Sequence, residues 1–261
     1  MRRAILIAAS LGALVLTWAL RAATPPLVWL AWPVPLAYLV LLYLGVTLPR
    51  FALFAPMFCR GPRSRPEVAL TFDDGPDTDP TRKVLAALAR AQARATFFVL
   101  GSKARQAPEV VAEIAAAGHE IGIHGDTHDR WLSVRHPDAI AASLERALAT
   151  VESASSRRPH LFRPPLGHTS PRTAVAARRL GLALVGWSVR SRDGLASTTA
   201  EDATRRVRAG LAPGAVILMH DASERSDREP VAAAALPAIL DEIARRGLRC
   251  VTISQLRRAE E

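Results

Sequence analysis

Seven short apolar runs alternate with longer stretches of helical periodicity, and this alternation limits the possible folds more than any other feature. The runs are expected to be β-strands, at residues 67–72, 95–100, 120–124, 161–163, 183–189, 215–220 and 250–254. Parallel strands need a crossover of a dozen or more residues, usually a helix. The chain is therefore predicted to be an α/β protein built from parallel β/α units, in a barrel or an open sheet.

The stretches between the runs carry helix start and stop signals. Several begin at or near a proline, which suits the first turn of a helix. Gly118, Gly181 and Gly247 each follow a helical stretch, where a glycine commonly ends a helix. The expected helices are residues 80–93, 108–117, 137–153, 171–180, 199–209 and 230–246.

The first 50 residues hold two uncharged apolar runs, at 4–20 and 22–49. A helix needs roughly 20 apolar residues to cross a bilayer. The runs predict a transmembrane helical hairpin with its turn at 21–26, although a signal-peptide core is an alternative for the first run. The expected division is a membrane anchor over residues 1–50, a juxtamembrane linker over 51–65 and a catalytic domain over 66–261.

The flanking charges bear on sidedness. Two arginines precede the expected hairpin and four follow it, namely Arg2, Arg3, Arg50, Arg60, Arg63 and Arg65. The positive-inside rule then favours a domain on the cytoplasmic side of the cell membrane if both helices span. With one spanning helix the domain faces outward. In either case the lipid bilayer is an expected partner.

The net charge of +10 does not indicate nucleic-acid binding. Residues 1–65 carry seven arginines and no lysine or acidic residue, so all 24 acidic groups fall in the rest of the chain, where basic and acidic residues nearly balance. The positive charge therefore belongs to the flanks of apolar runs rather than to a basic face. Two cysteines, Cys59 and Cys250, are too few for a disulfide framework and are expected to be free thiols.

Polar motifs follow the ends of several expected strands. Asp73 and Asp74 end the first, and His124 and His128 follow the third. Asp-Gly-Pro alone indicates a turn, and two histidines alone are often surface groups. Together, Asp74, His124 and His128 form a three-ligand set that leaves coordination positions open. Zinc suits it best, and Mn, Co, Ni or Fe also fit. Asp73 is left over as a base.

Two later motifs fall at strand ends as well. Arg163-Pro164-Pro165-Leu166-Gly167 is a rigid loop, in which the Leu166 N–H is a candidate oxyanion donor and Arg163 a candidate partner for Asp73. A surface arginine is the alternative reading. His220 ends an apolar run and is a candidate general acid, or otherwise a core histidine. The residues expected to bind substrate along the pocket are Pro164, Pro165, Leu166, Trp187 and Leu218.

In this order the motifs Thr-Phe-Asp-Asp-Gly-Pro, His-x-x-x-His, Arg-Pro-Pro-x-Gly and Leu-x-His resemble the polysaccharide deacetylase family, or carbohydrate esterase family 4, over residues 66–256. The resemblance implies a distorted (β/α) barrel, a divalent metal that is often zinc, and removal of N-acetyl groups from sugars such as N-acetylglucosamine. It assigns Asp73 as base, Arg163 as the residue holding it and His220 as acid. Asp74, His124 and His128 become the metal ligands.

The sequence departs from the family pattern at two places. The family usually has an aromatic residue where this chain has Leu166, so stacking on a sugar is expected to be weaker there. The fourth motif usually reads Asp-x-x-Asp-Trp, but here Arg190 replaces the first carboxylate. A nearby Arg190 would lower the pKa of His220, whereas Asp193 is a candidate to replace the missing acid.

Three functions follow from these motifs. The first is a metal-dependent hydrolase that deacetylates amino sugars of a poly- or oligosaccharide. The second keeps the same site but acts as a deacylase or deformylase of a lipid-linked amino sugar. The third is a tethered carbohydrate-binding domain with a decayed site, which the presence of every expected ligand argues against.

Overall fold

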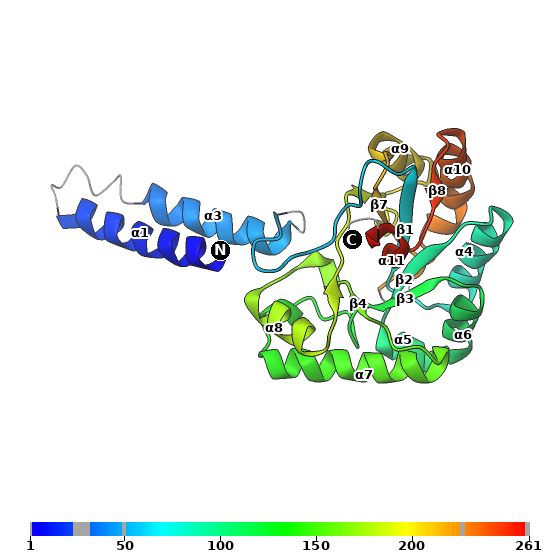
Figure 1. Ribbon diagram of the computed structural model, residues 1–261, viewed down its shortest axis with the longest axis horizontal. Coiled ribbons are helices and arrows are strands. Elements are labelled where there is room, and N and C mark those ends of the chain that lie inside the picture. Colours follow the sequence, from blue (N-terminus) through cyan, green and yellow to red (C-terminus); the bar gives the residue numbers. More distant parts are fainter. Residues whose placement is uncertain (1, 23–31, 49–50, 225–227, 259–261) are drawn as a thin grey trace.

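The computed structural model describes residues 2–22, 32–48, 51–224 and 228–258. Two helices at the N-terminal end, α1 (Arg2–Ala22) and α3 (Pro33–Thr47), lie side by side and project away from the rest of the molecule (Figure 1). They are linked by a hydrogen bond of 2.6 Å between the Ser10 and Tyr38 hydroxyl groups. The expected turn at 21–26 lies mostly outside the described residues.

The expected transmembrane hairpin is wrong. Within the described part of the chain, no helix combines the length and the apolar character needed to cross a membrane. The second apolar run, expected to span, yields an α3 of only 15 residues, fewer than the roughly 20 that a bilayer requires. The expectation of a bilayer partner loses its basis with the hairpin.

The remaining chain folds around a sheet of parallel strands in the order β5-β4-β3-β2-β1-β7-β6, with β8 pairing only with β1. The α/β class and the parallel pairing are as predicted. The strands are β1 (Glu67–Asp73), β2 (Ala95–Val99), β3 (Glu120–Ile123), β4 (Leu161–Phe162), β5 (Ala183–Leu184), β6 (Val189–Arg190), β7 (Val216–His220) and β8 (Arg249–Cys250). The sheet curves into a half-barrel rather than a closed one, because β5 and β6 do not pair.

The central strand β1 shows how the sheet separates two layers. Val68, Leu70 and Phe72 belong to the large core between the sheet and the helices outside it. Ala69 belongs to a smaller core inside the half-barrel. Thr71 and Asp73 alternate with these outer residues and so share the inner face. The inner face of β1 therefore changes from apolar to polar toward its C-terminal end.

The predicted strand at 183–189 is two strands. β5 and β6 lie at opposite edges of the sheet, and the residues between them, including Trp187, cross the open side of the half-barrel. There the chain meets residues 58–61, here called the seam segment. Phe58 bridges to Val185 and Arg60 bridges to Ala215, which leads into β7. The seam segment thus joins the two edges that β5 and β6 leave apart.

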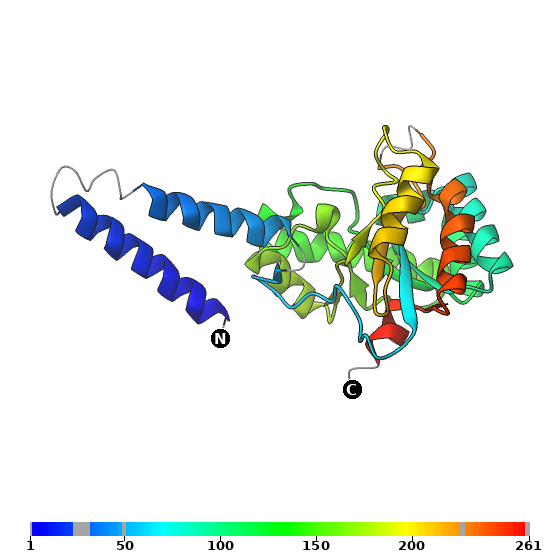
Figure 2. The same cartoon turned by 90° about the horizontal axis from the view of Figure 1, so that it is seen from above.

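Helices cover the outside of the half-barrel, and Figure 2 shows the α1–α3 pair projecting to one side of them. The major ones agree with prediction to within about three residues: α4 (Thr78–Arg90), α6 (Pro108–Ala116), α7 (Pro137–Ser155), α8 (Pro171–Arg179), α9 (Ala200–Gly210) and α10 (Ala232–Arg245). Gly118, Gly181 and Gly247 have positive φ, as helix-ending glycines do. Two short helices were not predicted, α5 (Gly101–Gln106) and α11 (Ile253–Arg257). The second begins inside the strand expected at 250–254, of which only residue 250 belongs to β8.

The packing of the seam segment yields a stability prediction at Gly214. A Cβ there would lie 2.2 Å from the Gly61 carbonyl oxygen, and the residue has φ +77°. Gly214→Ala is therefore expected to combine left-handed backbone strain with a clash against backbone, and to lower the free energy of unfolding by about 2–4 kcal/mol. Urea unfolding monitored by circular dichroism measures the change.

Gly181→Ala is the matched control. Gly181 has a similar φ of +66°, but a Cβ there meets nothing within 4 Å. In this variant the free energy of unfolding should fall only by the cost of the left-handed backbone, about 1–2 kcal/mol. Equal losses in the two variants would mean that the contact between Gly214 and the seam segment adds nothing to stability.

Candidate active site

The two aspartates at the end of β1 differ in their surroundings. Asp73 is the last residue of the strand and Asp74 follows it with φ 72° in the left-handed region. Both side chains are nearly inaccessible, yet both reach the wall of a pocket of about 430 Å³ at the C-terminal ends of the strands. This is the edge at which β/α barrels build their active sites, as predicted.

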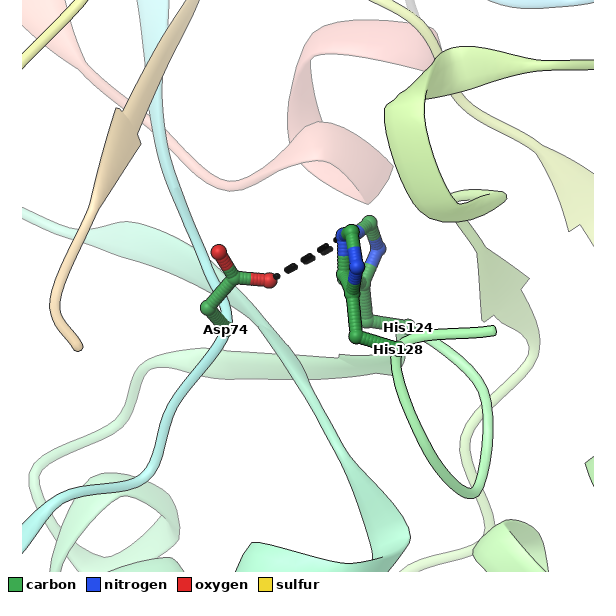
Figure 3. Close-up of side chains that lie close together, drawn as sticks. All are labelled: Asp74, His124 and His128. Carbon is green, nitrogen blue, oxygen red and sulfur yellow. Dashed lines mark ion pairs between the residues drawn. The ribbon is translucent and has the colours of Figure 1, made fainter. Parts of the chain in front are cut away.

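His124 and His128 converge on Asp74 (Figure 3). His124 follows directly after β3, and its Nε2 lies 3.5 Å from Asp74 Oδ1. The turn that follows brings His128 Nε2 to 3.6 Å from the same oxygen. One ligand atom from each of the three residues lies within 4.8 Å of the others. The predicted ligand set is therefore assembled in space.

The imidazole of His124 is oriented so that Nε2 faces Asp74. Its Nδ1 lies 2.7 Å from the Arg163 carbonyl oxygen, and since a carbonyl only accepts, Nδ1 carries the proton and donates it. The lone pair is then on Nε2. Burial lowers the pKa of His124, which favours the neutral form that metals bind.

The three residues fit a divalent cation. Ligand atoms bound tetrahedrally at about 2.1 Å from one ion lie about 3.4 Å apart, close to the 3.5 Å and 3.6 Å found here. Asp74 Oδ1, the oxygen shared by both contacts, is buried without a hydrogen-bond partner. A buried carboxylate oxygen left in this way is costly unless a cation completes it.

Arg163 is fully buried and fixes the second aspartate. Its guanidinium donates to Asp73 Oδ1 at 2.7 Å, to the Thr71 hydroxyl at 2.8 Å and to the Gly186 carbonyl at 2.9 Å. It also lies 4.1 Å from the ring centroid of Phe98. Asp73 Oδ2 is not part of this network and lies 4.0 Å from His124 Nε2. Asp73 is thus held by one oxygen while the other faces the pocket.

His220, the last residue of β7, is paired with Asp193. Its Nδ1 lies 3.0 Å from Asp193 Oδ1, and its backbone N–H donates to Asp193 Oδ2 at 2.7 Å. Burial works against the charged ring, but the Asp193 carboxylate and its hydrogen bond, with smaller effects of Asp74 and Asp73, raise the pKa of His220 to about 9. His220 is therefore protonated at neutral pH.

The expectation that Arg190 depresses the pKa of His220 is wrong. Arg190 is exposed at the mouth of the pocket, where its guanidinium lies 5.8 Å from the ring centroid of Trp187. It is not among the groups that shift the pKa of His220, which is raised rather than lowered. Strand alternation explains this, because Arg190 is exposed whereas Ser191 and Asp193 are buried. Asp193 is the carboxylate that contacts His220.

The apolar wall of the pocket is partly as predicted. Leu166, Trp187 and Leu218 line it, and Leu166 is 39% exposed with φ 58°. Pro164 and Pro165 do not line it. Both are buried and shape the turn that carries Leu166. The four histidines His119, His136, His160 and His168, expected to be structural or surface groups, also lie outside the pocket lining.

Sequence reasoning missed Glu224 and Arg130. Glu224 Oε1 lies 3.4 Å from His128 Nδ1, and both carboxylate oxygens accept hydrogen bonds from Arg130, at 3.2 Å and 2.6 Å. A carboxylate on the far nitrogen of a ligand histidine orients the ring and raises its basicity. Both residues lie in loops without a recognisable motif, so no local signal identifies them.

The parallel half-barrel holds an aspartate and two histidines at a spacing that fits a cation. A spare carboxylate and a protonated histidine face the same pocket. Together these features define a metal-dependent hydrolase. The family model described as polysaccharide deacetylase matches residues 60–185. Together with the relatives described next, this shows that the chain belongs to the polysaccharide deacetylase family, and it is accordingly a carbohydrate deacetylase.

Two relatives and one solved structure illustrate the similarity. A peptidoglycan-N-acetylglucosamine deacetylase of Bacillus cereus is 33% identical over 196 residues, which is 75% of this chain and 70% of that protein. A chitooligosaccharide deacetylase of Sinorhizobium fredii is 36% identical over 60% of this chain and 72% of its own length. A family 4 acetyl xylan esterase from Clostridium thermocellum, solved with a cobalt ion, is 32% identical with a TM-score of 0.65, over 72% of this chain and 89% of that one.

The His220–Asp193 pair predicts a pH dependence. Because the folded-state pKa of His220 is raised from 6.5 to about 9, the pair contributes stability fully below pH 6.5, and this contribution is lost as pH rises through 9. In Asp193→Asn the pKa should fall and the loss should begin at lower pH. Titration of the His220 ring by NMR in chelator-treated protein, without a cation's charge, measures it. An unchanged pKa would remove Asp193 as its cause.

Proposed function

We propose that this protein is a metal-dependent deacetylase that removes N-acetyl groups from amino sugars of a poly- or oligosaccharide. One observation supports this more than any other. Asp74, His124 and His128 form a cation-sized cluster, while the adjacent Asp73 is held outside it by Arg163. Hydrolysis by a metal-activated water requires metal ligands and a separate carboxylate that acts as the base.

Asp74, His124 and His128 are the proposed metal ligands. The ion, when bound, supplies Lewis-acid polarisation of the amide carbonyl and lowers the pKa of water. Zinc suits a carboxylate with two imidazoles, and cobalt, manganese, nickel or iron share that preference. A related esterase was solved with a cobalt ion, which supports a divalent metal in this family.

Asp73 is the proposed general base. Arg163 holds Oδ1 at 2.7 Å, so that Oδ2 faces the pocket and takes the proton from the attacking water. The fixed position matters because proton transfer requires hydrogen-bond reach in the reacting complex. Arg163 acts through Asp73 and has no contact with the pocket of its own.

His220 is the proposed general acid. It lies on β7 in direct register with Asp73 on β1, and with a pKa of about 9 it is protonated at neutral pH. It can therefore give its proton to the departing amine. The Leu166 N–H, on a turn fixed by Pro164 and Pro165, is the proposed donor to the developing oxyanion. Trp187, Leu218 and the Leu166 side chain are proposed to contact the sugar.

Replacing each aspartate separately distinguishes their roles. Asp73→Asn should keep the metal and lose activity by about 10²–10⁴-fold, the usual share of acid–base catalysis. Asp74→Asn should lose the metal itself. Metal content by elemental analysis, together with acetate release from tetra-N-acetylchitotetraose, measures both. Near-normal turnover in Asp73→Asn would exclude it as the base.

Metal binding is also expected to stabilise the fold. An ion that binds only the native state raises the free energy of unfolding by RT ln(1 + [L]/Kd), about 2.7 kcal/mol at a hundredfold excess over Kd. Adding Zn²⁺ to chelator-treated wild type should therefore raise its melting temperature. Asp74→Asn should show no comparable rise, and an equal rise in both proteins would place the ion elsewhere.

A further inference from the structure

Arginines gather around the mouth of the catalytic pocket. Arg130, Arg190, Arg192 and Arg228 all line it together with the proposed metal ligands. Two of them have partners, since Arg130 pairs with Glu224 and Arg228 donates to the Gly194 carbonyl. Within the described part of the chain, Arg190 and Arg192 form no ion pair with an acidic side chain. Their charges are available to a ligand.

The backbone presents these two arginines to the pocket as a pair. Along residues 190–193, Arg190 and Arg192 are exposed, whereas Ser191 and Asp193 are buried. The buried pair is anchored, because the Ser191 hydroxyl bonds the Leu218 carbonyl at 2.8 Å and Asp193 holds His220. The arginines are thus carried by the same few residues that position the proposed general acid.

Two further features fix where the charges lie. The Arg190 guanidinium lies 5.8 Å from the ring centroid of Trp187, on the pocket wall proposed to contact the sugar. Arg192 has φ 62°, in the left-handed region, which costs a residue with a side chain about 1–2 kcal/mol. A glycine would adopt this backbone conformation without that cost. The arginine at position 192 is therefore explained by what its side chain does, not by the backbone.

The negative groups of the pocket do not neutralise this pair. Asp73 is held by Arg163, Asp74 lies against the two ligand histidines, and Glu224 is engaged by Arg130. The carboxylates are therefore committed within the pocket, and the mouth beside Trp187 keeps a positive charge.

We propose that Arg190 and Arg192 form a subsite for an anionic group, a carboxylate or a phosphate, on the sugar that bears the N-acetyl group or on its neighbour. This inference rests on the proposed function, which it deepens by naming the charge of the substrate. Guanidinium groups match carboxylate and phosphate oxygens in paired hydrogen bonds, and a positive rim speeds the encounter with an anionic glycan in a salt-dependent way.

The test compares three N-acetylated probes of similar size. Tetra-N-acetylchitotetraose is neutral, a tetrasaccharide of alternating N-acetylglucosamine and N-acetylmuramic acid carries carboxylates, and tetra-N-acetylchitotetraose 1-phosphate carries a phosphate. Wild-type protein with Zn²⁺ should show a higher kcat/KM for at least one anionic probe than for the neutral one. The probe preferred identifies whether the anion is a carboxylate or a phosphate.

Charge-removing variants then assign the preference to the two arginines. In Arg190→Gln/Arg192→Gln the ratio of kcat/KM for the preferred anionic probe over the neutral probe should fall about tenfold or more, the usual loss for hydrogen bonds to a charged group. Raising the salt concentration should raise the KM of that probe more steeply in wild type than in the double variant.

Arg90→Gln is the matched control. Arg90 is an exposed arginine at the end of α4, outside the pocket lining. The variant makes the same kind of change in charge, so the ratio and its salt dependence should stay at wild-type values. If Arg90→Gln also lost the preference for the anionic probe, the preference would be an effect of overall charge. The proposed subsite would then be overturned.

A second readout separates this inference from the proposed function. Calorimetric binding of the same probes to Asp73→Asn loaded with Zn²⁺ needs no turnover. If wild type releases acetate but treats neutral and anionic probes alike, the subsite is overturned and the deacetylase stands. If no probe releases acetate, the proposed deacetylation of these sugars is overturned. A binding preference for the anionic probes that the two arginine substitutions remove would then still support the subsite.

Discussion

The buried ion pair between Arg163 and Asp73 organises the site. A guanidinium at zero exposure inside the half-barrel costs several kcal/mol in lost hydration. Hydrogen bonds to Asp73, Thr71 and Gly186 offset this cost. The backbone carbonyl of Arg163 also accepts a hydrogen bond from His124 Nδ1. One arginine therefore fixes both the free oxygen of the proposed base and the ring orientation of a proposed metal ligand.

Much of the fold and site follows from the sequence because the chemistry stands at the ends of apolar runs. The runs at 67–72 and 215–220 are buried strands, and in parallel strands the residues that follow meet at one edge. Asp73 and His220 could thus be placed together from their positions in the sequence. The run at 183–189 could not be divided, because apolar character does not record that the chain leaves one edge of the sheet and joins the other.

Other features depend on contacts that no local pattern encodes. The second apolar run near the N-terminus is long enough by composition to predict a membrane-spanning helix. Only the structure shows that α3 ends after 15 residues. Arg190 in place of an acid predicted a lowered pKa for His220, whereas in the structure Arg190 is exposed at the pocket mouth and the buried Asp193 pairs with His220. Glu224 lies beside His128 but belongs to a loop far away in the sequence. A contact of this kind has no fixed sequence spacing by which it could be recognised.

The seam segment has a consequence for where the catalytic unit begins. Residues 58–61 bond to both margins of the open side. The Phe58 N–H donates to Leu184 and the Gly186 N–H donates to Phe58 at one margin, and the Gly61 N–H donates to Gly214 at the other. Gly186 is also an acceptor for Arg163. A polypeptide trimmed to start at the first strand would therefore leave the Gly186 amide unpaired beside Arg163, the residue that holds the proposed base. The minimal working enzyme includes a stretch that composition alone assigns to a tether.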